Sequence, residues 1–174
     1  MARARRVTPG GFVYHVFNRG SRKGVLFDTS EDYDVFVELM EEARRKRPMR
    51  IIAYSLMKTH VHFILWPRAD KELSAFMQRL TGNHARSFHR RRGTTGLGAV
   101  YQSRYKALPI LDDRRLITTW LYVERNALKG GFVERADEWP WCSAWQGDHS
   151  APPFETDEGP IPRPSNWLSI LNNS

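Results

Sequence analysis

Apolar and polar positions alternate in residues 11–19, GFVYHVFNR, so that every second side chain would fall on one face of an extended chain. Residues 49–57 and 59–66 are rich in β-branched and aromatic side chains, and the short gap between them predicts an antiparallel hairpin. A further strand is expected in AVYQSRYKALPIL, residues 99–111. The pattern therefore predicts the four strands of a sheet.

Apolar residues recur at helical spacing in three other stretches. Helices are expected over residues 30–47 and 72–91, and a third helix should be capped by Asp112 or Asp113 and run to Lys129. The resulting order is βαββαβ followed by one more helix. This order predicts an α+β fold of ferredoxin-like topology. Two helices would cover one face of an antiparallel sheet, and the additional C-terminal helix would dock on the other.

Length and composition fit one globular domain. A chain of 174 residues with 41% hydrophobic content can bury a single sizeable core. We assign residues 1–146 to this domain and expect the Pro-containing residues 147–174 to form an irregular tail. No apolar stretch approaches the length of a membrane span, and the basic N-terminus lacks the apolar run of a signal peptide. These features predict a cytoplasmic protein with no membrane partner.

The charge balance narrows the choice of partner. Lys and Arg number 27 against 19 Asp and Glu, which gives a net charge of +8 and a pI near 10.0. This excess favours a polyanionic partner, with nucleic acid as the leading candidate, although a basic protein without such a partner has the same composition. The only cysteine, Cys142, can form neither an internal disulfide nor a thiolate metal site. A metal would therefore need histidine and oxygen ligands.

The stretch KTHVHFILW places two histidines where apolar residues are expected. In a strand, His60 and His62 share one face, while Val61, Phe63 and Leu65 share the other. On a helix the two imidazoles would diverge by roughly 200°, so the pair converges only in a strand. A half-buried strand with two hydrogen-bonded histidines is the simplest interpretation. The alternative is a metal site on the open face of the sheet.

The third predicted helix carries an unusual polar face. Its apolar side chains fall on one arc, and Tyr122 and Asn126 lie on the opposite side, one turn apart. A surface tyrosine that makes one hydrogen bond is the simple interpretation of Tyr122. Glu124 falls inside the apolar arc, and the pattern gives no reason for a carboxylate there.

A second interpretation joins the helix to the histidine pair. The imidazoles of His60 and His62 and the side-chain oxygen of Asn126 make three ligands for a divalent ion, either Mg²⁺ or Mn²⁺. Tyr122 would then be a nucleophile that attacks a DNA phosphodiester. A phenol is mostly protonated at neutral pH, so the metal and cationic neighbours would have to assist it. The products, a covalent phosphotyrosine and a free hydroxyl, suit strand transfer because another DNA end can reverse the step.

Basic and aromatic residues supply candidate DNA contacts elsewhere in the chain. The candidates are Arg19, Arg22, Lys23, Arg90, Arg91, Arg104, Tyr105, Lys106 and Arg115. His84 and His89, on the basic second helix, are expected to contact phosphates. Interleaved aromatic and basic side chains can stack bases and bind phosphates together, which gives weak support to a single-stranded substrate.

Several segments resemble one known family. LMKTHVHFILW is similar to the His-hydrophobic-His motif of the single-tyrosine HUH transposases, the IS200-like group. VYHVFNRGSRK, FMQRLTGNHARSFHRR, VYQSRYKALPI and LYVERNALKGGFVERADEWPWCSA also resemble that group, particularly its REP-associated tyrosine transposase branch. The resemblance covers about residues 10–145. It implies that His60, His62 and Asn126 bind the metal and that Tyr122 is the nucleophile.

Two departures from the family pattern are visible. Family members commonly have Pro-Asn before the first histidine and Asn-Pro after the tyrosine, where this chain has Lys58-Thr59 and Asn126-Ala127. Neither departure removes a residue to which the resemblance gives a role, although Lys58 can alter the local loop.

These observations predict a metal-dependent tyrosine transposase. It would be a DNA strand transferase and endonuclease that cleaves and rejoins single-stranded or hairpin DNA through a covalent 5′-phosphotyrosine. The alternative is a non-catalytic nucleic-acid-binding module of ferredoxin-like fold, which would leave the histidine pair without a role. The resemblance implies tyrosine-helix exchange within dimers for some relatives and monomers for the REP-associated branch, and we favour a monomer here.

Overall fold

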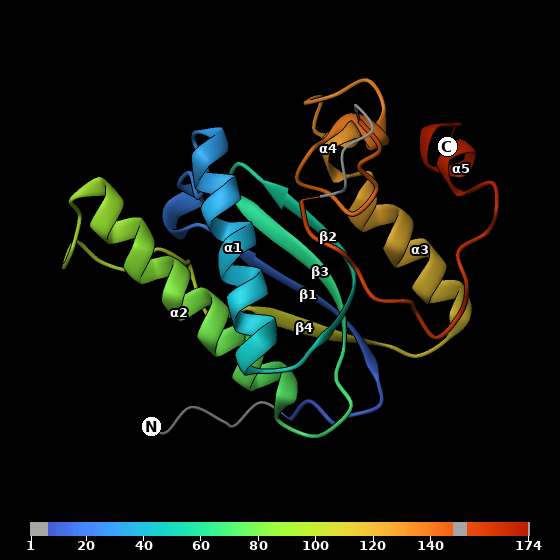
Figure 1. The fold of residues 1–174 in the computed structure, drawn as a ribbon, viewed down its shortest axis with the longest axis horizontal. Coiled ribbons are helices and arrows are strands. Elements are labelled where there is room, and N and C mark those ends of the chain that lie inside the picture. The colour runs from blue at the N-terminus through green and yellow to red at the C-terminus, as the bar shows by residue number, and fades with distance from the viewer. Residues whose placement is uncertain (1–6, 148–152, 174) are drawn as a thin grey trace.

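A computed structural model describes residues 7–147 and 153–173 of the chain. Its centre is an antiparallel sheet of four strands in the spatial order β2-β3-β1-β4 (Figure 1). The strands are β1 (Val13–Arg19), β2 (Arg50–Met57), β3 (His60–Trp66) and β4 (Lys106–Ile110). Central β1 and β3 are consequently flanked by β4 and β2. The α+β, ferredoxin-like prediction is confirmed.

Helices α1 (Ser30–Lys46) and α2 (Glu72–Arg92) cover one face of the sheet (Figure 1). Thr29 caps α1 in a reciprocal pair with Asp32, which satisfies backbone N–H groups that the first turn leaves free. Val61, Phe63 and Leu65 point into this layer and are at most 1% exposed. The period-two pattern thus assigned these three side chains to the packed face correctly.

The opposite face carries α3 (Asp113–Glu124), whose contacts with the sheet are concentrated on β2 and β3. Asp112 caps this helix by accepting the Arg115 backbone N–H at 2.8 Å. The prediction of one helix to Lys129 is wrong, because Arg125 leaves helical geometry at φ −89° and ψ 2°. A separate turn, α4 (Asn126–Lys129), follows. The helix is therefore interrupted at Arg125, and Asn126 begins a new helical turn.

The predicted strand over residues 99–111 is shorter in the structure, since only β4 pairs continuously with β1. Residues before it curve away: Tyr101 forms an isolated bridge with Gly20, and Gln102 donates its backbone N–H to the Arg19 carbonyl at 2.9 Å. This curve puts the Val100 side chain into the core beside α2. The first residues of the predicted strand therefore pack against α2 and do not pair continuously with β1.

The C-terminal segment also differs from the irregular tail that was expected. Its described part ends in the helix α5 (Trp167–Asn173) and lies against the domain. Phe154 is 1% exposed and packs edge-on against Tyr54, while the Asp157 backbone N–H bonds to Ile51 on β2. Two short 3-10 helices complete the fold: η1 (Ser21–Lys23) and η2 (Ala136–Glu138). No helix within the described part of the chain is long and apolar enough to cross a membrane.

Candidate active site

His60 and His62 lie on the face of β3 that α3 covers, as the alternation predicted. Their ring centroids are 5.1 Å apart and their planes are nearly perpendicular. His62 is 6% exposed and His60 is half-buried. Strand pairing places Phe17 opposite His62 and Arg19 opposite His60, so the predicted DNA contact Arg19 is adjacent to the histidine pair.

A third histidine, His15 of β1, lies beside the pair. The sequence pattern had placed it in a strand but had not predicted a role for it. Its Nε2 lies 3.0 Å from Nδ1 of His62, and the two rings are stacked. Nδ1 of His60 lies 3.1 Å from the Thr59 hydroxyl. Each β3 histidine is therefore engaged through Nδ1. An outer hydrogen bond of this kind fixes the tautomer and ring orientation of a metal-binding histidine.

Burial keeps the three imidazoles neutral at neutral pH. It lowers the pKa of His15 to about 4, and that of His62 to about 2 with further lowering from His15, His60 and Arg19. Burial also lowers the pKa of His60, although a hydrogen bond with the Asn126 side chain opposes this shift. A neutral imidazole has a nitrogen lone pair to donate, and this is the form that binds metal ions.

Helix α3 brings Tyr122 to the same place. Its ring meets His62 edge-on at 5.5 Å and His15 edge-on at 5.7 Å between centroids. Tyr122 is nonetheless 41% exposed, so the side chain is reachable from solvent. The Lys129 ammonium lies 5.6 Å from the centre of the tyrosine ring and adds positive charge beside it.

Asn126 follows one turn later, at the start of α4. Its Nδ2 donates to the Tyr122 carbonyl at 2.9 Å, which orients the amide. The Asn126 side chain also interacts with His60, so the turn that follows the break at Arg125 brings this amide beside the histidine pair. The structure thus brings together His60, His62, Tyr122 and Asn126.

These residues fit a divalent ion only when the amide is counted. Within residues 7–147 and 153–173, no group of three or more His, Cys, Asp or Glu side chains has metal-binding spacing. The available donors are two imidazole nitrogens, on His60 and His62, and the Asn126 oxygen. Mixed nitrogen and oxygen donors with positions left open suit a catalytic ion of the Mn²⁺ or Mg²⁺ type.

The other predicted DNA contacts scatter over the molecule. Arg115 is on the first turn of α3, and Lys106 of β4 lies 5.8 Å from the Phe17 ring, on the face that carries His62. Arg22 and Lys23 form η1 with positive φ angles of 52° and 59°. Their roles as DNA contacts stay predictions.

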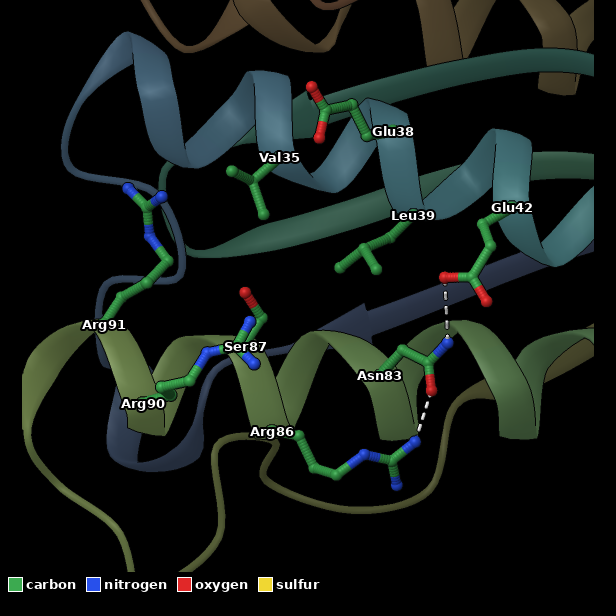
Figure 2. Close-up of a pocket in the computed structure, with 9 residues that line it drawn as sticks. All are labelled: Val35, Glu38, Leu39, Glu42, Asn83, Arg86, Ser87, Arg90 and Arg91. Atoms are coloured by element: carbon green, nitrogen blue, oxygen red, sulfur yellow. Dashed lines mark hydrogen bonds between the residues drawn. The ribbon is translucent and has the colours of Figure 1, made fainter.

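Arg90 and Arg91 lie in the opposite helical layer. They line a pocket between α1 and α2 of about 430 Å³, to which α1 also contributes Glu38 and Glu42. Figure 2 shows Glu42 joined by a hydrogen bond to Asn83 of α2, which in turn accepts one from Arg86. Arg91 is also ion-paired with Glu31 at 2.9 Å. Acidic neighbours weaken the positive potential there, so this pocket is a poorer anion site than its arginines alone suggest.

Arg104 and Tyr105 line a larger groove of about 1110 Å³, formed by α2, the N-terminal segment and residues 98–105. Tyr105 is only 8% exposed, so most of its ring packs in the core. His84 is 3% exposed and bonds to the Tyr101 hydroxyl at 2.6 Å, so its predicted contact with phosphate is wrong. His89 lines the groove and is bonded to Thr94.

Glu124 proves to be fully buried on the opposite side of α3 from Tyr122. Four side chains donate to its carboxylate: Trp120 at 3.0 Å, Ser143 at 2.6 Å, Arg163 at 2.6 Å and Trp167 at 2.7 Å. Arg163 and Trp167 belong to the C-terminal segment. This segment therefore fastens the helix that carries the tyrosine.

The fold and these residues agree with one protein family. The family model described as "Transposase IS200 like" matches residues 11–126, and the chain belongs to this family of transposases. Family membership makes the protein a DNA transposase and confirms the resemblance on which the expectation was based. No similar sequence was found among the curated proteins.

Two solved structures are similar in fold. The structure of a REP-associated tyrosine transposase bound to a REP hairpin aligns with a TM-score of 0.64 and 22% identity, covering 92% of this chain and 99% of that one. A structure described as a candidate transposase from Deinococcus radiodurans R1 aligns with a TM-score of 0.47 and 19% identity, covering 72% of this chain and 97% of the other. The first supports the fold over nearly the whole chain.

Proposed function

We propose that this transposase is a metal-dependent single-tyrosine enzyme of the REP-associated type. It cleaves and rejoins single-stranded or hairpin DNA through a covalent 5′-phosphotyrosine on Tyr122. The observation that carries the proposal is the position of Tyr122: a half-exposed phenol edge-on to the neutral imidazole of His62, one turn before Asn126. A tyrosine that served only to pack would be buried among apolar side chains, whereas Tyr122 is 41% exposed and lies against imidazoles.

His60, His62 and Asn126 would hold the divalent ion, with Mg²⁺ and Mn²⁺ as the candidates. When bound, the ion supplies positive charge that stabilises a phosphoryl group under attack. The chain contributes the orientation: His15 and Thr59 hold the imidazoles through Nδ1. The break at Arg125 sets the direction of the amide.

In the proposed step, the Tyr122 hydroxyl oxygen loses its proton and forms a bond to phosphorus. The bond between phosphorus and the 3′ oxygen breaks, and that oxygen leaves as a 3′-hydroxyl after it gains a proton. One phosphoester bond replaces another, so no hydrolysis occurs and an incoming 3′-hydroxyl can reverse the step. Arg19 and Lys129 add positive charge near the reacting phosphate.

A single chain contains all the proposed parts of the site. Tyr122 and Asn126 meet His60 and His62 within one chain, because α3 and α4 dock on that chain's own sheet. The C-terminal segment secures this docking through Glu124. We therefore propose a catalytically complete monomer that acts on DNA with unpaired or hairpin bases.

A trapping experiment tests the proposal. Pools of single-stranded and hairpin oligonucleotides with randomised bases, labelled at either the 5′ or the 3′ end, are incubated with Mn²⁺ and the protein and resolved under denaturing conditions. A 5′-phosphotyrosine retains the 3′-labelled fragment on the protein and releases the 5′-labelled one.

Tyr122→Phe is the matched control, since it removes only the hydroxyl. It should abolish the adduct and leave DNA binding nearly intact. An adduct that survives in this variant, or one that retains the 5′ label instead, would show that the proposed chemistry is incorrect.

A further inference from the structure

A pocket of about 540 Å³ opens beside the candidate active site, between β4 and the first turns of α3. Its volume lies within the range of roughly 300–1,000 Å³ that is typical of small-ligand sites. Leu108, Pro109 and Ile110 of β4 form one side, Arg114, Arg115, Thr118 and Thr119 of α3 form the other, and Asp112, which caps α3, lies between them in the chain and also lines the pocket. Apart from His15, no residue that lines this pocket has a role in the chemistry described above.

The pocket exists because α3 does not cover the whole sheet face. The helix rests mainly on β2 and β3, so the β1–β4 side of that face is left open. Strand pairing places Leu108 directly opposite His15 on this open side. Leu108 is 52% exposed there, which is unusual for a leucine in the middle of a strand.

The pocket is continuous with the site through two shared elements. His15 lines it, and the same ring contacts both His62 and Tyr122. Thr118 lines it from α3, one turn before Tyr122. A group held in the pocket is therefore next to whatever reacts at the phenol.

The chemistry of the walls suits a nucleotide. Leu108 and Ile110, alternate residues of β4 on the face that carries His15, offer an aliphatic surface to the flat face of a base. Thr118 and Thr119 bring hydroxyls, although the Thr118 hydroxyl already donates to the Arg114 carbonyl at 2.7 Å.

Two arginines add positive charge at the mouth. Arg115 is ion-paired with Asp112 at 3.5 Å, a weak attachment because both side chains are more than half exposed. Within the described part of the chain, Arg114 forms no ion pair. Together the walls provide an apolar slot and a cationic rim, which match a base and its phosphate.

We propose that this pocket binds the nucleotide adjacent to the scissile phosphate, with its base against Leu108 and its far phosphate at Arg114. The proposal rests on the function proposed for Tyr122, and it adds a place where the enzyme can discriminate among bases next to the cleaved bond. Cleavage preference at that nucleotide then depends on the walls of the pocket.

The first measurement is binding without chemistry. Thymidine 3′,5′-bisphosphate, the smallest unit with a base and two phosphates, is titrated to millimolar concentration into full-length protein with labelled leucine and threonine methyl groups. NMR should show saturable shifts of the Leu108 and Thr118 methyls. Leu111 is the internal control, because it is 65% exposed just after β4 and is not among the residues that line the pocket.

The matched variants are Leu108→Ala and Leu111→Ala. Loss of the Leu108 surface should weaken the bisphosphate by about fivefold, whereas the Leu111 change should leave its affinity within about twofold. Shifts that fail to saturate, or that are equal at Leu108 and Leu111, would overturn the proposal.

The second measurement uses adducts trapped from the randomised oligonucleotides. Sequencing them gives the base frequencies on both sides of the cleaved bond. Leu108→Ala should flatten the preference at one adjacent position, and Leu111→Ala should retain it. Identical frequencies in all three proteins would overturn the pocket's role.

The two measurements separate this proposal from the proposed function. Adducts that form in the wild type while Leu108 is silent in both experiments would refute the pocket and keep the function. If no adduct forms at all, the proposed function fails, and the pocket's place beside a scissile phosphate fails with it. Saturable shifts would then still identify a nucleotide site of another kind.

Discussion

Helix α3 carries polar groups on two sides, and the protein surrounds them in opposite ways. Glu124 is 0% exposed and accepts hydrogen bonds from four side chains. Tyr122, two residues earlier, is 41% exposed and lies edge-on to the neutral imidazoles of His15 and His62. The neighbours of Glu124 supply hydrogen bonds to its carboxylate and cover it completely. The Tyr122 side chain, in contrast, stays accessible to a molecule from solvent.

This difference separates a structural polar cluster, around Glu124, from the cluster proposed as the active site, around Tyr122. A buried charge is stable only when its partners are supplied by the fold, and Arg163 and Trp167 supply them here. A site must instead retain donors for something that arrives from outside. The side of α3 that faces His60 and His62 meets this requirement. Substitutions on the two sides should therefore affect different measurements.

The largest expected effect is on stability, from Glu124→Ala. The change leaves the Arg163 guanidinium and two indole N–H groups without their acceptor, so the free energy of unfolding should fall by about 3–5 kcal/mol. Urea denaturation measures this loss. Glu134→Ala, at an exposed position, should stay within about 0.5 kcal/mol of the wild type. A Glu124 variant as stable as the Glu134 variant would contradict the interpretation of this cluster.

Loss of the two histidines proposed as metal ligands should affect activity instead. His60→Ala and His62→Ala should each lower the rate of adduct formation by at least about a hundredfold, because each removes a proposed metal ligand. Circular dichroism should show that both variants remain folded. The intervening Val61→Asp should do the reverse and unfold the domain, since it buries an unpaired charge under α1 and α2. Full activity in either histidine variant would make the pair structural.

A smaller effect is expected from His15→Phe, which keeps a ring in place but removes the partner of His62 Nδ1. The affinity for Mn²⁺ should fall by about tenfold to a hundredfold, measured by calorimetry without DNA. His84→Gln is the control, because His84 is buried in the opposite layer. Equal Mn²⁺ affinity in the His15 variant and the wild type would remove His15 from the site.

The smallest effect is a pH dependence of stability in metal-free protein. Burial lowers the pKa of His15 and of His84 to about 4, so the unfolded chain binds more protons below the usual histidine pKa of 6.5. Their contribution is complete above pH 6.5 and declines as the pH falls toward 4. Between pH 7.5 and 5.5 each should cost roughly 1 kcal/mol, and His84→Gln should remove one such share. Stability that is flat over this interval would contradict the low pKa values.

Local periodicity was enough to predict the histidine face and the tyrosine face. The alternation in β3 separated His62 from Val61 and Phe63, and the 3.6-residue repeat placed Tyr122 on the polar side of its helix. Both inferences use only neighbours along the chain. The IS200-like family match agrees with the resemblance noted in the same segments.

Features that depend on distant residues were missed. The contact between His15 and His62 follows from the pairing of β1 with β3, which joins residues 47 positions apart. Glu124 has no local explanation because Arg163 and Trp167 lie 39 and 43 positions away, in a segment that composition suggested was irregular. The sequence likewise did not predict the break at Arg125, because apolar residues continue at helical spacing as far as Leu128.

The two edge strands of the sheet, β2 and β4, are each protected from pairing with a strand of another molecule. The outer edge of β2 is covered by other segments of the same chain. The Leu56 backbone N–H donates a hydrogen bond to the Trp141 carbonyl, and the Asp157 N–H donates one to the Ile51 carbonyl, both shorter than 3 Å. The opposite edge, β4, spans only Lys106–Ile110 and has Pro109, which lacks an N–H group, within it. A short edge strand that contains a proline and a lysine is a poor template for a strand from another molecule. The sheet should consequently resist edge-to-edge polymerisation even at high protein concentration.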